Sequence, residues 1–189
     1  LKGLLQVEAK YIEQMGVSPL WEIQGWDLPD ADFTPDKPHE HSDGLALTPL
    51  RVEMLKPYPE DWTEQWNKNI SELNNIVQKT DKLLIDQMWK NWWDNFSIPT
   101  NNALVINDKE GMNMGYHIDN RAILGVLLIN LQDNQDSTIF MDDYKAPTSK
   151  GTGFFMLNNN QKHKIIVTKD RLLVYQTLTV SSMFTNNPG

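Results

Sequence analysis

Residues 115–130 read GYHIDNRAILGVLLIN, and this stretch decides how the second half of the chain is interpreted. Alternating side chains at 115–119 are followed by a continuous apolar run at 122–130, the patterns of a half-buried and a fully buried strand. Short runs of the same two kinds recur at 103–107, 137–141, 151–157, 163–168 and 171–180. Strands repeated at roughly ten-residue intervals predict a β-sandwich or barrel.

The first half of the chain has a different composition and apolar pattern, and all seven tryptophans lie in it. Apolar residues spaced three to four apart predict helices at 60–79 and 81–96, and a short helix is expected at 2–15. Residues 17–50 are rich in proline, so we expect irregular structure with one or two strands, such as 20–26 and 45–50. The fold class is therefore α+β and mainly β, with N-terminal helices covering one sheet.

Composition excludes several kinds of function. The chain has no cysteine, so thiolate metal sites and disulfides are absent, and a cytoplasmic location is expected. A net charge of -8 with few arginines argues against binding to phosphate backbones, and no nucleic-acid partner is expected. No apolar run approaches the ~20 residues of a membrane span, so no membrane partner is expected either. The arginines are Arg51, Arg121 and Arg171.

The candidate site begins with His117 and Asp119, which point to the same face if 115–119 is a strand. His163 opens a later strand and is the only other histidine of the β half. Two histidines and one carboxylate form the facial triad of non-haem Fe(II) oxygenases, which leaves coordination positions open. The simpler alternative is a surface ion pair, or a buried histidine oriented by a carboxylate.

Arg171 follows His163 closely enough to share its site. If residues 168–170 form a three-residue hairpin loop, Val167 pairs with Arg171, and Arg171 then shares a face with His163. A chain-like diacid could then bind the metal at one end and the planar guanidinium at the other. A two-residue loop would point Arg171 away, and a bond to Asp170 is the alternative role for this arginine.

The stretch from Gly115 to Val180 resembles the 2-oxoglutarate/Fe(II)-dependent dioxygenases, most of all their prolyl-4-hydroxylase-like branch. The resemblance rests on "HID" at 117–119, the distant His163 and the following Arg171. It implies a double-stranded β-helix, or jelly roll, with helices on the outer sheet. It also implies Fe(II) held by His117, Asp119 and His163, with 2-oxoglutarate on that iron and on Arg171. Such enzymes convert 2-oxoglutarate to succinate and use oxygen to hydroxylate a C–H bond.

The chain departs from the family pattern in two places. Asp136 and Ser137 stand where many relatives carry two glycines, and the strand at 125–130 lacks the tyrosine that commonly binds 2-oxoglutarate. Tyr116 and Tyr175 are the candidates to replace it. The alternative function is therefore a non-catalytic jelly-roll binding module that lost full cofactor binding. A cupin-like metal enzyme without 2-oxoglutarate is a third hypothesis.

These patterns together predict one domain over 1–189, with a helical and irregular part at 1–99 and a jelly-roll core at 100–181. The substrate is expected to be a small molecule or a peptidyl side chain, together with oxygen. His39 and His41 form a rival metal motif, but they lie among loop-forming residues and are expected to be solvated. The aromatic run at 89–93 is expected to pack in the core.

Overall fold

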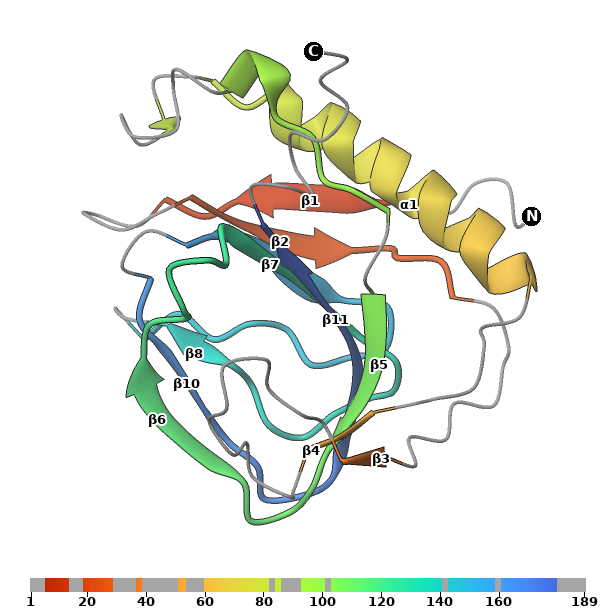
Figure 1. The fold of residues 1–189 in the computed structure, drawn as a ribbon. Helices are drawn as coiled ribbons and strands as arrows, with labels where there is room; N and C mark the ends of the chain where they lie inside the picture. The colour runs from red at the N-terminus through yellow and green to blue at the C-terminus, as the bar shows by residue number, and fades with distance from the viewer. Residues whose placement is uncertain are drawn as a thin grey trace.

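The computed structural model describes residues 6–13, 19–28, 37–38, 51–53, 60–81, 84–85, 93–100, 103–140, 143–158 and 161–179. These residues form two antiparallel sheets with one long helix, α1 (Glu60–Gln78), beside the larger sheet (Figure 1). A short 3-10 helix, η3 (Trp93–Asn95), precedes the β half.

The larger sheet has eight strands, and the smaller sheet has three. In spatial order, the larger sheet contains β1 (Glu8–Tyr11), β2 (Leu20–Gln24), β9 (Gly153–Leu157), β7 (Gly125–Asn130), β11 (Arg171–Leu178), β5 (Ala103–Asp108), β4 (Arg51–Glu53) and β3 (Lys37–Pro38). The smaller sheet contains β6 (Asn113–His117), β10 (His163–Ile166) and β8 (Ile139–Phe140). From β5 to β11, each strand lies in the opposite sheet from the strand before it (Figure 1).

Alternation of side chains along the larger sheet separates two apolar clusters. Along β11, Val174 and Leu178 belong to the cluster beneath α1, whereas Leu173 belongs to a second cluster that includes Phe140 of β8. The second cluster therefore fills the space between the two sheets. Most of its buried members lie on strands of the β half, and Leu20 of β2 joins them from the first half of the chain.

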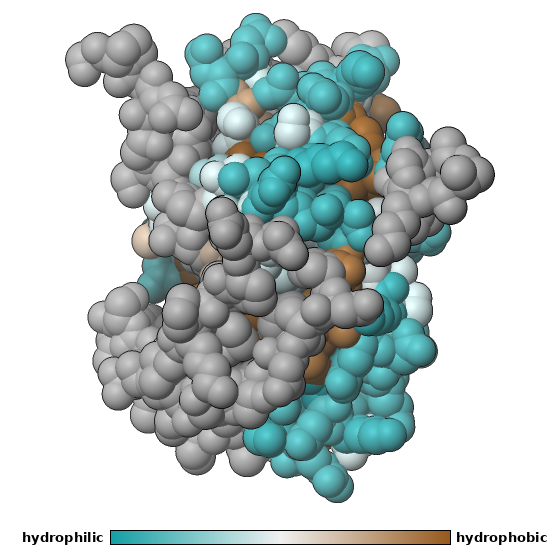
Figure 2. Space-filling model, turned by 90° about the vertical axis from the view of Figure 1, so that its right-hand side faces the viewer, coloured by the Kyte–Doolittle hydropathy of each residue, from teal (hydrophilic) through white to brown (hydrophobic). Residues whose placement is uncertain are grey.

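Helix α1 is amphipathic, and its apolar face closes the other side of the larger sheet. Trp62, Trp66, Ile70, Leu73 and Val77 are buried at helical spacing. Its exposed positions are all polar, and hydrophilic side chains dominate the upper part of the face in Figure 2. Among the described residues, no helix is long and apolar enough to cross a membrane.

The strand predictions for the β half agree with the structure, with shifts of a few residues at the ends. The helix at 60–79 and the strand at 20–26 are also confirmed, as α1 and β2. The short helix expected at 2–15 is wrong, because residues 8–11 form β1 and pair with β2. Most of the predicted helix 81–96, and the predicted strand 45–50, lie outside the described residues.

Candidate metal centre

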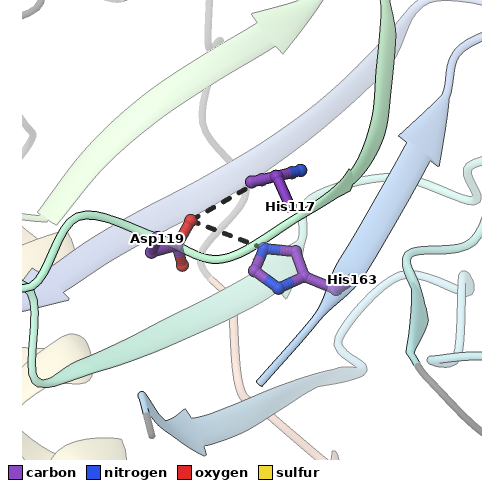
Figure 3. Close-up of side chains that lie close together, drawn as sticks. All are labelled: His117, Asp119 and His163. Carbon is purple, nitrogen blue, oxygen red and sulfur yellow. Dashed lines mark ion pairs between the residues drawn. The ribbon is translucent and has the colours of Figure 1, made fainter. Parts of the chain in front are cut away.

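Three side chains predicted as ligands converge between β6 and β10. His117, Asp119 and His163 each offer a donor atom, and these atoms all lie within 4.8 Å of one another. Oδ1 of Asp119 lies 3.7 Å from Nε2 of His117 and 3.5 Å from Nε2 of His163 (Figure 3). The two imidazole rings are centred 4.5 Å apart. Within the described residues, this is the one cluster of three such groups with metal-ligand spacing.

A β-bulge brings the two histidines opposite each other. Ile165 pairs with Met114, so a regular antiparallel ladder would place Tyr116 opposite His163. The register shifts between His163 and Ile165, and His163 instead pairs with His117. Bulges commonly redirect side chains next to functional sites. Directly opposed residues point to the same face, so the two imidazoles meet.

Both histidines are oriented by backbone carbonyl groups. Nδ1 of His117 lies 2.7 Å from the carbonyl oxygen of Gly115, and Nδ1 of His163 lies 2.9 Å from that of Gln161. A carbonyl oxygen only accepts, so each Nδ1 carries a proton, and Nε2 is the nitrogen of each ring that remains available to bind a metal. Both Nε2 atoms lie on the Asp119 side, which is the arrangement of histidines that bind a metal through Nε2.

Asp119 lies two residues beyond the end of β6, not inside a strand as the sequence predicted. Its Oδ2 is buried and accepts no hydrogen bond from the described part of the protein. A buried carboxylate oxygen without a donor is costly unless a cation binds it. Together with the two Nε2 atoms, it fits a divalent cation that prefers imidazole and carboxylate ligands, such as Fe(II).

The electrostatics of the cluster attract positive charge. Burial lowers the pKa of His163, whereas the hydrogen bond and charge of Asp119 raise it. The carbonyl of Gln161 raises it further, while the charge of Arg171 opposes the rise, and the net pKa lies above the ordinary value. The field at His163 therefore favours a cation.

Arg171 lies on the inward face of β11 and already has protein partners. Its Nε donates to Oδ2 of Asp108 at 2.9 Å, and its Nη1 donates to the hydroxyl of Thr138 at 3.3 Å. The side chains of Arg171 and Asp108 are 4% and 0% exposed, so the ion pair is buried. The two residues face each other directly in the β5–β11 ladder.

The three-residue hairpin loop on which the shared face of His163 and Arg171 was made to depend does not form. β10 and β11 belong to different sheets, and Val167 exchanges backbone hydrogen bonds with Gly111 and Met112 instead of pairing with Arg171. Residues 167–170 therefore cross from one sheet to the other. Arg171 nevertheless points between the sheets, because it shares the face of Leu173 on β11.

The two candidate tyrosines, Tyr116 and Tyr175, lie in different places. Tyr116 is exposed on the outer face of the small sheet, where the ammonium group of Lys164 lies 4.6 Å from its ring centre. It does not face the space between the sheets. Tyr175 is half-buried and packs against the cluster that fills that space. His39 and His41 lie outside the described residues, and Trp93 of the 89–93 run is buried as expected.

Three further residues near the site, Asp108, Thr138 and Asn158, were not predicted from the sequence. Asp108 ends an apolar strand, which is a weak sign of a buried acid, but its pairing with Arg171 needs the strand register. Asn158 begins the run 158–160, which reads as an ordinary turn. Its amide contacts the backbone around Asp119, so its place in the site follows only from the folded chain.

Known proteins resemble this chain only weakly. No protein-family model matches the sequence, and no curated protein matches it significantly. A protein from Shewanella oneidensis proposed to be an oxygenase aligns at a TM-score of 0.40 and 12% identity, over 69% of this chain and 62% of its own. An oxidoreductase of the 2OG-Fe(II) oxygenase family from Burkholderia pseudomallei aligns at 0.43 and 9% identity, over 94% and 75%. Likenesses this small leave the family and activity to be argued from the site.

Proposed function

We propose that this chain is an Fe(II)- and 2-oxoglutarate-dependent oxygenase that hydroxylates a C–H bond. The observation that carries the proposal is the convergence of His117, Asp119 and His163, with both Nε2 atoms facing a carboxylate that keeps one buried oxygen without a donor in the described part of the chain. Two imidazoles and one carboxylate leave room for further ligands on the same ion.

The strand order supports a jelly roll, or double-stranded β-helix, as the frame of this site. Consecutive strands from β5 to β11 alternate between the two sheets, and the strands that meet are far apart in the sequence. This alternation winds the chain around a single interior. It also explains how residues from β6, its following loop and β10 come together.

Each residue of the site has a defined task in this proposal. His117, Asp119 and His163 would hold Fe(II), and the two backbone carbonyls orient the imidazole rings with Nε2 toward Asp119. Arg171 would bind the far carboxylate of 2-oxoglutarate, because its planar guanidinium is buried between the sheets. When bound, Fe(II) and 2-oxoglutarate supply the oxidising chemistry together with oxygen. The substrate would be a small molecule or a peptidyl side chain.

The buried pair of Arg171 and Asp108 favours a second candidate function. Asp108 already gives this guanidinium a carboxylate partner, which a 2-oxo diacid would have to join or displace. A jelly-roll module that binds a metal through the three ligands but does not take up 2-oxoglutarate would keep this pair unchanged. Such a module needs the metal cluster and no co-substrate.

An anaerobic titration of the purified protein distinguishes the two candidates. Fe(II) is added first, followed by 2-oxoglutarate, while absorption is recorded. An oxygenase gives a metal-to-ligand charge-transfer band on the second addition, and it releases succinate once oxygen is admitted. Fe(II) binding without the band supports the metal-binding module. If no Fe(II) binds at all, both candidates are overturned.

A further inference from the structure

Asn158 lies directly after β9 and reaches the loop that carries Asp119. Its Nδ2 lies 3.3 Å from the carbonyl oxygen of Asp119, 3.2 Å from that of Asn120 and 2.8 Å from that of Ile123. Its own backbone N–H donates to the carbonyl of Leu124 at 2.8 Å. One side chain therefore binds three carbonyls of the loop that immediately follows β6.

The orientation of the Asn158 amide is set by its surroundings. All three neighbours of Nδ2 are carbonyl oxygens, which only accept, so the NH2 group must face them. Reversing the amide would place its oxygen against three other oxygens. The loop itself is a compact turn, since the N–H of Ile123 donates to the carbonyl of Asn120 and the N–H of Ala122 donates to Oδ1 of Asn120.

The three candidate ligands differ in how they are supported. Each histidine is oriented through its own side chain, by a carbonyl bound at Nδ1. Asp119 has no such support from the described residues, because its Oδ2 has no hydrogen-bond donor there and Oδ1 faces only the two imidazoles. Apart from the two imidazoles, the position of its carboxylate depends on its backbone, and among the described side chains Asn158 is the one that binds that backbone.

We infer that Asn158 is a positioning residue of the metal centre, which fixes Asp119 by binding the carbonyls of the loop 119–123. This inference rests on the proposed metal site and adds a fourth residue that never touches the ion. Loss of an outer-shell partner of a metal ligand typically lowers metal affinity by about 10- to 100-fold. Asn158→Ala should therefore weaken Fe(II) binding by that factor.

The test compares two substitutions of Asn158, which remove its amide donors to different extents, with the substitution of a control asparagine elsewhere in the chain. Asn158→Ala removes both amide donors, whereas Asn158→Ser keeps one shorter donor and should lose less affinity. Asn74 is the control, since it also binds the backbone through its amide, at both the N–H and the carbonyl of Ile98, far from the site along the chain. Anaerobic Fe(II) titration calorimetry measures affinity, and thermal unfolding of the metal-free proteins measures stability.

The expected result is a lower melting temperature for both alanine variants but a loss of Fe(II) affinity only for the Asn158 variants, with serine between alanine and wild type. Equal Fe(II) affinity in wild type and Asn158→Ala overturns the inference and leaves the proposed function standing. Equal losses in Asn158→Ala and Asn74→Ala also overturn it, because the effect would then be one of global stability. If wild type binds no Fe(II), the proposed function fails together with the inference.

Discussion

Two carboxylates near the strand ends of the β half differ in what surrounds them. Asp108, the last residue of β5, is fully buried and bonded to the guanidinium of Arg171. Asp119, just beyond β6, is 13% exposed in its side chain and keeps a buried oxygen without a donor among the described residues. The first acid has its counter-charge within the chain, whereas the second has only two imidazoles beside it.

This difference assigns the two acids different tasks. A buried charge without a partner is unfavourable, so Asp108 and Arg171 stabilise the fold only as a pair. In the proposed function, Asp119 binds a cation supplied from outside, and its charge already raises the pKa of His163. A site that must take up a ligand is expected to keep such incompletely satisfied groups.

The largest effect is expected when one candidate ligand is removed from the cluster of His117, Asp119 and His163. We expect His117→Ala to abolish Fe(II)-dependent conversion of 2-oxoglutarate to succinate, because a direct ligand matters more than an outer-shell partner, whose loss alone costs about 10- to 100-fold. Succinate release under oxygen measures this. The control is Ile118→Ala, which truncates the exposed neighbouring side chain. Equal losses in both variants would contradict the assignment of His117.

Breaking the buried ion pair of Arg171 and Asp108 should mainly lower the free energy of unfolding. Asp108→Asn leaves the Arg171 guanidinium buried without its carboxylate, which is expected to lower the free energy of unfolding by about 3–5 kcal/mol. Urea denaturation measures the change. Lys109→Ala is the control, because the ion pair of Lys109 with Asp170 is exposed at 3.5 Å and is expected to contribute at most about 1 kcal/mol. Similar costs for the two variants would refute the contrast between the two pairs.

Neutralising Asp119 should have the opposite effect, because it should change metal binding and leave the stability of the metal-free protein nearly unchanged. Asp119→Asn is expected to change the unfolding free energy of the metal-free protein by less than about 1 kcal/mol. Wild type should gain about 2.7 kcal/mol when Fe(II) is present at a hundred times its Kd, and Asp119→Asn should lose this gain. Anaerobic thermal unfolding with Fe(II), and again after chelation, measures both. An unchanged metal response in Asp119→Asn would remove Asp119 from the site.

Strand positions and the three residues of the candidate cluster were accessible from the sequence because they depend on local patterns. Alternating and continuous apolar runs located the strands of the β half, and the spacing of His117 and Asp119 indicated a shared site. The helix expected at 2–15 was wrong because the pattern there is weak, and pairing of β1 with β2 decides the conformation. Tertiary context commonly overrides such propensities.

The remainder of the site depends on register and on crossings between sheets, which local patterns do not encode. The bulge that sets His117 opposite His163 appears only once β6 and β10 are paired. The hairpin loop considered before Arg171 does not form, because residues 167–170 cross between sheets. The same crossing brings Arg171 opposite Asp108, a partner 63 residues away that no spacing rule could supply.

Glu22 is a third acid, which has a hydrogen-bond partner but is only half-buried. Removing its partner is expected to have the smallest effect on stability. The hydroxyl of Tyr144 donates to its Oε1 at 2.6 Å, and burial, with the hydrogen bond and charge of Glu22, raises the pKa of Tyr144 well above its ordinary value. A raised folded-state pKa means that the stabilisation is fully present below the unfolded-state pKa of about 10 and is lost as pH rises above it.

Tyr144→Phe should therefore flatten the decline of unfolding free energy above about pH 10, while costing roughly 0.5–1.5 kcal/mol at neutral pH for one lost hydrogen bond. Urea denaturation at neutral and alkaline pH measures both quantities. Tyr116→Phe is the matched control, because that tyrosine is exposed and its removal should leave the pH slope as it is in wild type. Parallel slopes in all three proteins would show that the Glu22–Tyr144 bond contributes nothing in solution. A flatter slope in Tyr144→Phe alone would place Glu22 with Asp108 among the acids whose partner lies within the chain, leaving Asp119 as the acid that needs one from outside.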